Sequence, residues 1–159
     1  LLRYGGAATG RGTSRTIGAR PYVFLREDVI LEREIDFLLK KLEKRHQDSI
    51  KIIGKQTMGA ILDGESLKKG VYNHFSCVFF LTEQKRPHDA ALPGGEYASL
   101  FYRGAYDRLE EHWRALRAGL EAQGLTPDGP PLELYHIDAH DTNREEEYVT
   151  ELQVRVARA

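Results

Sequence analysis

The chain has 159 residues, with 23 Lys and Arg against 24 Asp and Glu, so its formal net charge is −1 with histidine neutral. This balance argues against a nucleic-acid-binding module, which is usually basic. With 41% hydrophobic residues, the chain can bury a core without disulfides or a structural metal. It has no run of about 18 apolar residues, so no transmembrane helix is predicted. The single cysteine, Cys77, fits a reducing compartment, and we expect a cytoplasmic protein.

The N-terminal segment is rich in glycine and has little to bury. We predict that residues 1–19 form a flexible arm or linker remnant, with attachment to the domain from Thr13 onward as an alternative. The chain begins with Leu1 rather than methionine, which suggests a processed chain or a fragment of a longer protein. Its first residues show no signal-peptide pattern. Residues 20–159 are expected to form a single domain.

The first half alternates segments typical of strands and helices. Residues 21–25 are rich in aromatic and branched side chains and predict a strand. A helix over about 31–47 is predicted by apolar residues spaced three and four apart, at Ile35, Leu38, Leu39 and Leu42. After it we expect extended chain at 50–53 and 56–62, a polar loop at 63–70, a strand at 75–81 and a charged connector at 83–92.

The second half repeats this order. A strand at 96–102 precedes a helix whose buried face is marked by Leu109, Trp113, Leu116 and Leu120. Asp107 is expected to cap the start of this helix, and Gly124 and Pro127 to end it. Strands are predicted at 132–137 and 148–156, the last with Leu152 and its alternate neighbours on one side and Glu151 on the other.

Both halves therefore follow the order β-α-β-β, and Tyr22 precedes Tyr97 by the same offset as Asp63 precedes Asp138. We predict an α+β fold built by duplication, with repeats at about 20–83 and 94–157 related by a pseudo-twofold axis. Each helix would cover one face of a sheet, and the two sheets would form a central groove, the natural place for a ligand.

Four motifs of the second half carry a resemblance to a known family. They lie at residues 92–98, 102–106, 130–135 and 150–154. In this order they resemble the GyrI-like effector-binding domain, which forms the C-terminal sensor of many MerR-family transcription activators. The resemblance implies binding of small molecules, often lipophilic cations, and some relatives resemble hydrolases of strained cyclopropane-containing toxins. It implies no DNA binding by this chain, because the helix-turn-helix and coiled coil of MerR-type regulators are absent from the sequence.

The resemblance also implies site residues. The groove glutamate of the family matches Glu151, and the aromatic residue beside it matches Tyr135, which we expect to lie near Glu151 on the adjacent strand. The simpler interpretations are a solvated Glu151 paired with Arg155 and a half-buried sheet tyrosine. A carboxylate in an apolar groove is costly unless it is paired, and a bound cation would supply that pairing.

Further residues are candidates for the groove wall. Ile61 and Cys77 are the approximate equivalents of Tyr135 and Glu151 in the first repeat, and Phe79 would face Gln153. Cys77 is expected to be a buried apolar residue rather than a nucleophile, since no histidine is evident to activate it. Tyr102 at a strand end and Trp113 on the helix stripe could reach a ligand, although turn packing and core packing are the favoured interpretations.

The sequence predicts no metal and no cofactor. His136, Asp138 and His140 alternate on one strand, but metal ligands usually converge from more than one element. The expected partner is a small molecule, with no membrane contact and with DNA reached only through a separate N-terminal domain. The sequence does not determine the oligomeric state.

Three functions are compatible with these residues. The first is a sensor domain that binds an amphipathic aromatic or cationic compound through Glu151, Tyr135 and the aromatic wall. The second is a hydrolase that opens strained electrophilic rings, with Glu151 as the general acid or base and Tyr135 as a proton donor. The third is a protein-interaction module of the gyrase-inhibitor type, which the mixed surface charge favours least.

Overall fold

The structure is a computed structural model that describes residues 12–53 and 56–159. The strands are β1 (Gly12–Ile17), β2 (Arg20–Leu31), β3 (Met58–Leu62), β4 (His74–Leu81), β5 (Ala90–Leu92), β6 (Gly95–Arg103), β7 (Leu125–Pro127), β8 (Leu132–Ile137) and β9 (Val149–Arg158). The α-helices of these residues are α2 (Ile35–Arg45), α3 (Gln47–Ile53), α4 (Gly64–Lys68) and α5 (Leu109–Ala122). Short 3₁₀ turns lie at Glu32–Glu34, Tyr106–Arg108 and Glu145–Glu147.

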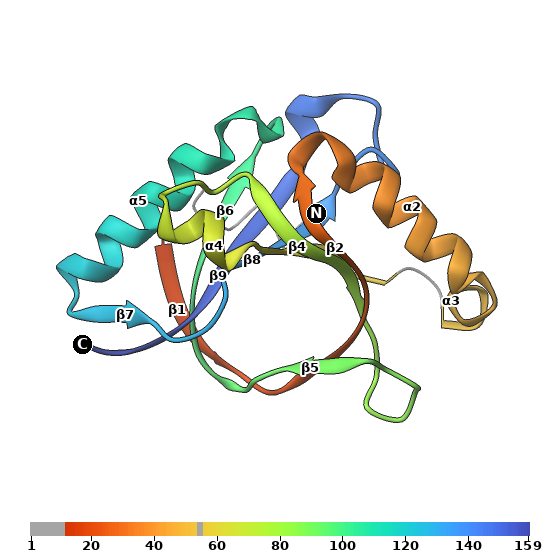
Figure 1. Cartoon of the computed structure of the whole chain (residues 1–159), viewed down its shortest axis with the longest axis horizontal. Helices are drawn as coiled ribbons and strands as arrows, with labels where there is room; N and C mark the ends of the chain where they lie inside the picture. The colour runs from red at the N-terminus through yellow and green to blue at the C-terminus, as the bar shows by residue number, and fades with distance from the viewer. Residues whose placement is uncertain (1–11, 54–55) are drawn as a thin grey trace.

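The strands form one antiparallel sheet in the order β1-β6-β9-β8-β3-β4-β2-β5, with β7 added alongside β9. The order shows the two repeats, β2-α2-β3-β4 and β6-α5-β8-β9, joined where β3 pairs with β8. The sheet curls into a half-barrel whose outer strands, β1 and β5, approach each other across the opening (Figure 1). The predicted duplicated α+β fold is thus confirmed, and the sheets of the two repeats are continuous through their central pair.

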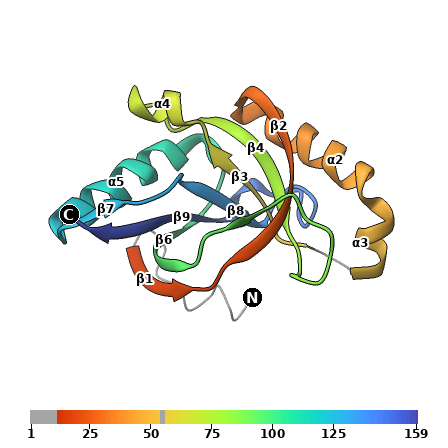
Figure 2. The same ribbon diagram turned by 60° about the horizontal axis from the view of Figure 1, so that its bottom comes forward.

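The two faces of the sheet carry separate cores. The helices pack on the convex face, as Figures 1 and 2 show, where α2 covers the first repeat and α5 the second. Their apolar stripes are buried there as the residue spacing predicts, at Ile35, Leu38, Leu39 and Leu42 of α2 and at Leu109, Trp113, Leu116 and Leu120 of α5. The concave face holds a second cluster, formed by Tyr22, Ile61, Cys77, Phe79, Leu92, Tyr97, Leu132 and Leu134.

Several local predictions are wrong. Residues 50–53, expected to be extended, belong to α3, because the chain continues from α2 and Ile50 packs against the core. The loop at 63–70 contains α4, whose N-terminus is capped by Asp63 through the backbone N–H of Ser66. Asp107 does not cap α5; it lies in a 3₁₀ turn that precedes the helix.

The ends of the elements also differ in part from the prediction. Residues 12–17 lie in the segment expected to be a flexible arm, but they form β1 because β6 offers an unpaired edge. Residues 1–11 lie outside the described residues. The charged connector at 83–92 ends in β5, which pairs with the start of β2. Helix α5 ends before Gly124, as predicted, and the positive φ of +70° at Gly124 explains why glycine follows it.

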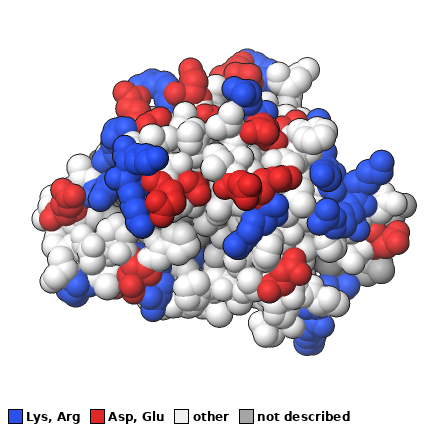
Figure 3. Space-filling view, viewed as in Figure 1, with Lys and Arg blue, Asp and Glu red and all other residues white. Residues whose placement is uncertain are grey.

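Acidic and basic side chains are interspersed on the face seen in Figure 3. None of the helices in the described part of the chain is long and apolar enough to cross a membrane.

Candidate functional site

A carboxylate is buried between the sheet and α5. Glu133 of β8 points to the helix-covered face, and the residue is 1% exposed. The indole Nε1–H of Trp113 donates a hydrogen bond to its Oε2 at 2.8 Å, and the Tyr135 hydroxyl donates to its Oε1 at 3.0 Å. Both donors are themselves buried. Two aromatic side chains thus fix the carboxyl group of Glu133 inside an apolar core.

The electrostatics of this carboxyl group are unusual. Burial raises the pKa of Glu133 to about 7, although the hydrogen bonds from Trp113 and Tyr135 act in the opposite direction, and the charge of Glu32 raises the pKa further. No Lys, Arg or His of the described residues is within ion-pair distance of this carboxylate. Its negative charge therefore has hydrogen bonds but no counter-ion among the described residues, which is the arrangement that a bound cation would complete.

An open depression lies on the far side of Tyr106 from this carboxyl group, which does not line it. It measures about 580 Å³ and is lined by residues of the turns that precede α2 and α5, among them Glu32, Tyr106 and Asp107. The Tyr106 ring lies edge-on to the Tyr135 ring, with centroids 5.6 Å apart. Tyr106 and Tyr135 therefore form a continuous aromatic path from the depression to Glu133.

Glu32 adds a second acidic group at the depression. Burial raises its pKa to about 7, and the nearby charges of Asp107 and Glu110 raise it further. Two acidic residues, Glu32 and Asp107, thus line the depression beside Tyr106, and Arg33 lines it as well. Such a combination attracts organic cations, because a ring face and a carboxylate stabilise the same positive charge. A carboxyl group with a pKa near neutrality can also accept or donate a proton in catalysis.

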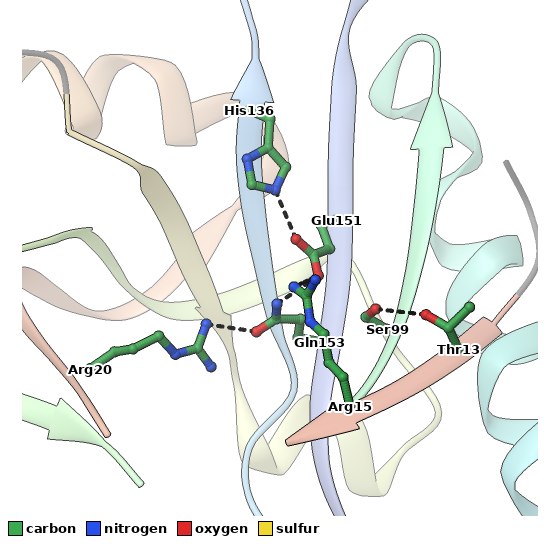
Figure 4. A network of polar contacts seen from close by, with 7 residues as sticks. All are labelled: Thr13, Arg15, Arg20, Ser99, His136, Glu151 and Gln153. Atoms are coloured by element: carbon green, nitrogen blue, oxygen red, sulfur yellow. Dashed lines mark hydrogen bonds and ion pairs between the residues drawn. The ribbon is translucent and has the colours of Figure 1, made fainter. Parts of the chain in front are cut away.

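Glu151, the sequence-predicted site carboxylate, lies on the other face of the sheet. It points to the concave face and is held by Arg15, His136 and Gln153 (Figure 4). The distances to its carboxylate oxygens are 2.8 Å from Arg15 Nη2, 2.9 Å from His136 Nε2 and 2.7 Å from Gln153 Nε2. Burial raises its pKa, but the contacts with His136, Gln153 and Arg15 outweigh this effect and hold the pKa below its ordinary value.

The expected convergence of Tyr135 and Glu151 is therefore wrong. In the β8–β9 pair, Glu151 is opposite Leu134, and Tyr135 is opposite Thr150. Cross-strand partners share a face, so Glu151 lies with Leu134 on the concave side while Tyr135 lies with the helices. Placing Tyr135 beside Glu151 required a register that differs by one residue, and a shift of one residue reverses the face.

The other predicted site residues divide between the two faces. Ile61, Cys77 and Phe79 are packed in the concave cluster. Burial raises the pKa of the Cys77 thiol to about 11, which makes it a poor nucleophile. Tyr102 and Trp113 lie on the helix-covered face, where the Tyr102 ring packs on His112 with centroids 4.2 Å apart. Of these residues, Trp113 contacts Glu133.

Sequence reasoning did not select Glu133 as a site residue. The sequence did contain a signal, because Glu133 and Tyr135 alternate with Leu132 and Leu134 along one strand. In the structure this strand, β8, lies between β9 and β3. An acidic residue in such a strand faces either solvent or a core, and only the position of α5 over β8 shows that it faces a core.

The three residues near the end of β8 that could bind a metal, His136, Asp138 and His140, do not converge on one point. His136 contacts Glu151 on the concave face, whereas Asp138 accepts hydrogen bonds from the backbone and the ring of His140. In the described residues, 12–53 and 56–159, no group of three or more His, Cys, Asp and Glu side chains is arranged to hold a metal ion.

Several solved structures share this fold. The C-terminal domain of EcmrR superimposes with a TM-score of 0.71 at 16% identity, over 94% of this chain and 98% of that one. In a complex of EcmrR with DNA, the match has a TM-score of 0.69 at 16% identity and covers 94% of this chain but 58% of that chain.

Two further structures are similar at lower identity. A hydrolase from Listeria innocua has a TM-score of 0.67 at 10% identity, over 98% of this chain and 96% of that one. SAV2435 bound to tetraphenylphosphonium has a TM-score of 0.55 at 14% identity, over 92% and 94% of the two chains. No curated protein sequence matches the chain significantly. The sequence profile of the GyrI-like small molecule binding domain matches residues 14–157, and the chain therefore belongs to this family.

Proposed function

We propose that this domain is a sensor for amphipathic aromatic cations and that Glu133 supplies the charge that holds them. The observation that carries the proposal is the buried Glu133 carboxyl group, which has two aromatic hydrogen-bond donors and no basic partner in the described residues. A cation seated next to it would offset the cost of keeping this group ionised. The sequence pointed to Glu151 for this task, but Glu151 already pairs with Arg15.

The aromatic side chains would supply the remaining affinity. Tyr106, which lines the open depression, would meet the ligand first, and Tyr135 and Trp113 lie beyond it around the carboxyl group. A cation over an aromatic face gains about 0.5 to 2 kcal/mol, depending on how dry the site is. Because Glu133 is closed off, rotation of Tyr106 or a shift of the turn at Tyr106–Arg108 would have to accompany entry.

Two of the similar structures support this proposal. SAV2435 is titled as bound to tetraphenylphosphonium, a lipophilic aromatic cation. EcmrR is titled in a complex with DNA, and this chain spans 58% of that EcmrR chain. By analogy, binding here would bias an equilibrium between two arrangements that a separate DNA-binding domain senses.

The direct test is titration with tetraphenylphosphonium and with neutral triphenylphosphine oxide, followed by calorimetry at pH 8. We expect the cation to bind more tightly than the neutral analogue, and Glu133→Gln to remove at least 90% of the affinity for the cation while leaving the neutral analogue unchanged. Glu146→Gln is the matched control, because Glu146 lies on the surface and pairs with Arg144. Equal binding of the cation by wild type and Glu133→Gln would refute the role of Glu133.

A second function, hydrolysis of a strained electrophilic ring, is favoured by one observation. Glu133 has a pKa of about 7 and accepts a hydrogen bond from Tyr135, as a general base with a proton-carrying neighbour would. Glu133 would take a proton from water as the water oxygen attacks a ring carbon. The ring bond would break, and the atom that leaves with the electron pair would take up a proton.

The hydrolase is tested by incubating the protein with an activated cyclopropyl ketone in ¹⁸O-labelled water. Turnover would give the ring-opened alcohol with one labelled oxygen, and Glu133→Gln would abolish it while ligand binding remains. A product that forms at the same rate without protein, or with Glu133→Gln, would exclude this function for Glu133.

A further inference from the structure

A second cavity lies beside the Glu133 site but opens elsewhere. It measures about 510 Å³ and lies between α4, α5 and the loop of residues 127–131 that joins β7 to β8. Its walls are apolar and include Leu62, Leu67, Trp113, Leu116, Leu120 and Val154. This volume is within the range of small-molecule sites, roughly 300 to 1,000 Å³. We call it the α4–α5 crevice.

The charged side chains that line the α4–α5 crevice are all basic, although Lys68 also forms an exposed ion pair with Glu65 of α4 at 3.2 Å. Arg26, Lys68 and Arg117 line it, and no Asp or Glu of the described residues does. Figure 3 shows basic side chains over α4 and the adjoining part of α5, with acidic side chains next to them. The chain as a whole has 24 acidic and 23 basic residues, so a lining with only basic charged residues is specific to the crevice.

One of the three cations is held in place. Arg117 Nη1 donates a hydrogen bond to the Tyr72 hydroxyl at 2.9 Å, and the Tyr72 ring stacks on Trp113 with centroids 6.2 Å apart. The guanidinium group of Arg117 is therefore fixed at the edge of an aromatic pair, with donors left for an acidic group. The Trp113 indole separates this cavity from Glu133, to which its Nε1–H points.

We propose that the α4–α5 crevice binds an amphipathic organic anion, such as a medium-chain carboxylate. Its apolar part would lie on Leu116, Leu120 and Val154, and its carboxylate would lie among Arg26, Lys68 and Arg117. Burial of the chain supplies most of the affinity. The three positive charges select the headgroup, since a cationic headgroup of the same size would meet repulsion in place of attraction. This site opens separately from the proposed cation site at Glu133, although Trp113 borders both.

The experiment uses decanoate, decan-1-ol and decyltrimethylammonium below their aggregation concentrations at pH 8. The chain has one tryptophan, Trp113, and it lines the crevice, so its fluorescence reports binding directly. We expect decanoate to change the fluorescence and to bind at least tenfold more tightly than decan-1-ol, with decyltrimethylammonium weaker still. Calorimetry gives the same affinities without relying on fluorescence.

Charge variants locate the anion. Arg26→Gln/Lys68→Gln should weaken decanoate binding at least fivefold and leave decan-1-ol unchanged. Lys41→Gln/Lys85→Gln is the matched control with the same net charge, because Lys41 and Lys85 are exposed and do not line the crevice. All four positions are on the surface, so the variants should keep the wild-type melting temperature.

Glu133→Gln separates this proposal from the previous one, because it should leave decanoate binding intact even if it abolishes cation binding. The inference is overturned if decanoate and decan-1-ol bind equally, if the quaternary ammonium binds most tightly, or if the two double variants weaken decanoate binding to the same degree.

Discussion

Glu133 and Glu151 are buried carboxylates on adjacent strands, and their side chains point to opposite faces of the sheet. Glu151 is opposite Leu134 in the β8–β9 pair, so it lies one position out of register with Glu133. Glu151 contacts Arg15, His136 and Gln153, whereas Glu133 contacts Trp113 and Tyr135. The pKa of Glu151 is consequently lowered and that of Glu133 raised. The first carboxylate already has a basic partner in Arg15, whereas the second has none among the described residues.

The raised pKa of Glu133 makes stability depend on pH. The folded state holds a proton that the unfolded state releases near pH 4.5, so the contribution of Glu133 to stability is fully present below that pH and is lost as pH rises through 7. In Glu133→Gln this loss should be absent. Relative to the variant, the free energy of unfolding of the wild type should fall by about 2 to 3 kcal/mol between pH 4.5 and pH 8. Urea unfolding at several pH values measures this, and parallel pH profiles of the two proteins would contradict it.

Cation binding at Glu133 should be linked to proton release. A proton competes with the ligand below pH 7, so the apparent affinity for tetraphenylphosphonium should fall about tenfold per pH unit below that value and level off above it. At pH 6, binding should release close to one proton. Calorimetry in two buffers with different ionisation enthalpies counts this proton, while an affinity that is constant from pH 5.5 to 8 would show that Glu133 is not involved.

Arg15 should protect the protein against acid. The lowered pKa of Glu151 contributes stability that is present above its unfolded pKa near 4.5 and lost as pH falls through the lower folded value. Arg15→Met weakens this effect and should cost about 1 to 2 kcal/mol at pH 7, a modest figure because the Arg15 side chain is 51% exposed. The difference from wild type should shrink below pH 4. Arg144→Met, which breaks a fully exposed pair, should leave stability nearly unchanged.

Removal of the Trp113 indole N–H should affect Glu133 specifically. Trp113→Phe leaves the Glu133 Oε2 without its hydrogen-bond donor. It should lower the free energy of unfolding by about 1 to 3 kcal/mol at pH 8. It should also raise the pKa of Glu133, since this hydrogen bond lowers it. In a double-mutant cycle with Glu133→Gln, the two changes should couple strongly, whereas a purely steric effect of the smaller ring would add independently.

The central β3–β8 pair requires glycine at position 59. A Cβ there would collide with the backbone carbonyl oxygen of Glu133 and come within 2.7 Å of Phe79 Cζ. Gly59→Ala should therefore separate the strands that join the two repeats and cost about 2 to 3 kcal/mol. Gly64→Ala is the control, because nothing lies within 4 Å of its Cβ position. A thermal melt of both variants suffices, and equal melting temperatures would contradict the close approach at Gly59.

The sequence alone determined the secondary-structure order and the duplication. Both follow from local patterns: the spacing of Leu109, Trp113 and Leu116 fixes one face of α5 regardless of what covers it, and the alternation along β9 separates Glu151 from Leu152. The conformation of residues 50–53 could not be read in this way, because a short apolar run fits a helix or a strand equally well.

The tertiary structure alone decided which of the two carboxylates pairs with a basic residue and which is buried without one among the described residues. A strand's alternation shows that Glu133 and Tyr135 share a face, but not what lies on that face, because neighbouring strands can pair in registers that differ by one residue. Only the pairing of Leu134 with Glu151 and the packing of α5 place Glu133 under Trp113. Likewise, β1 brings Arg15 to Glu151 across more than a hundred residues of chain, a pairing that no local pattern encodes.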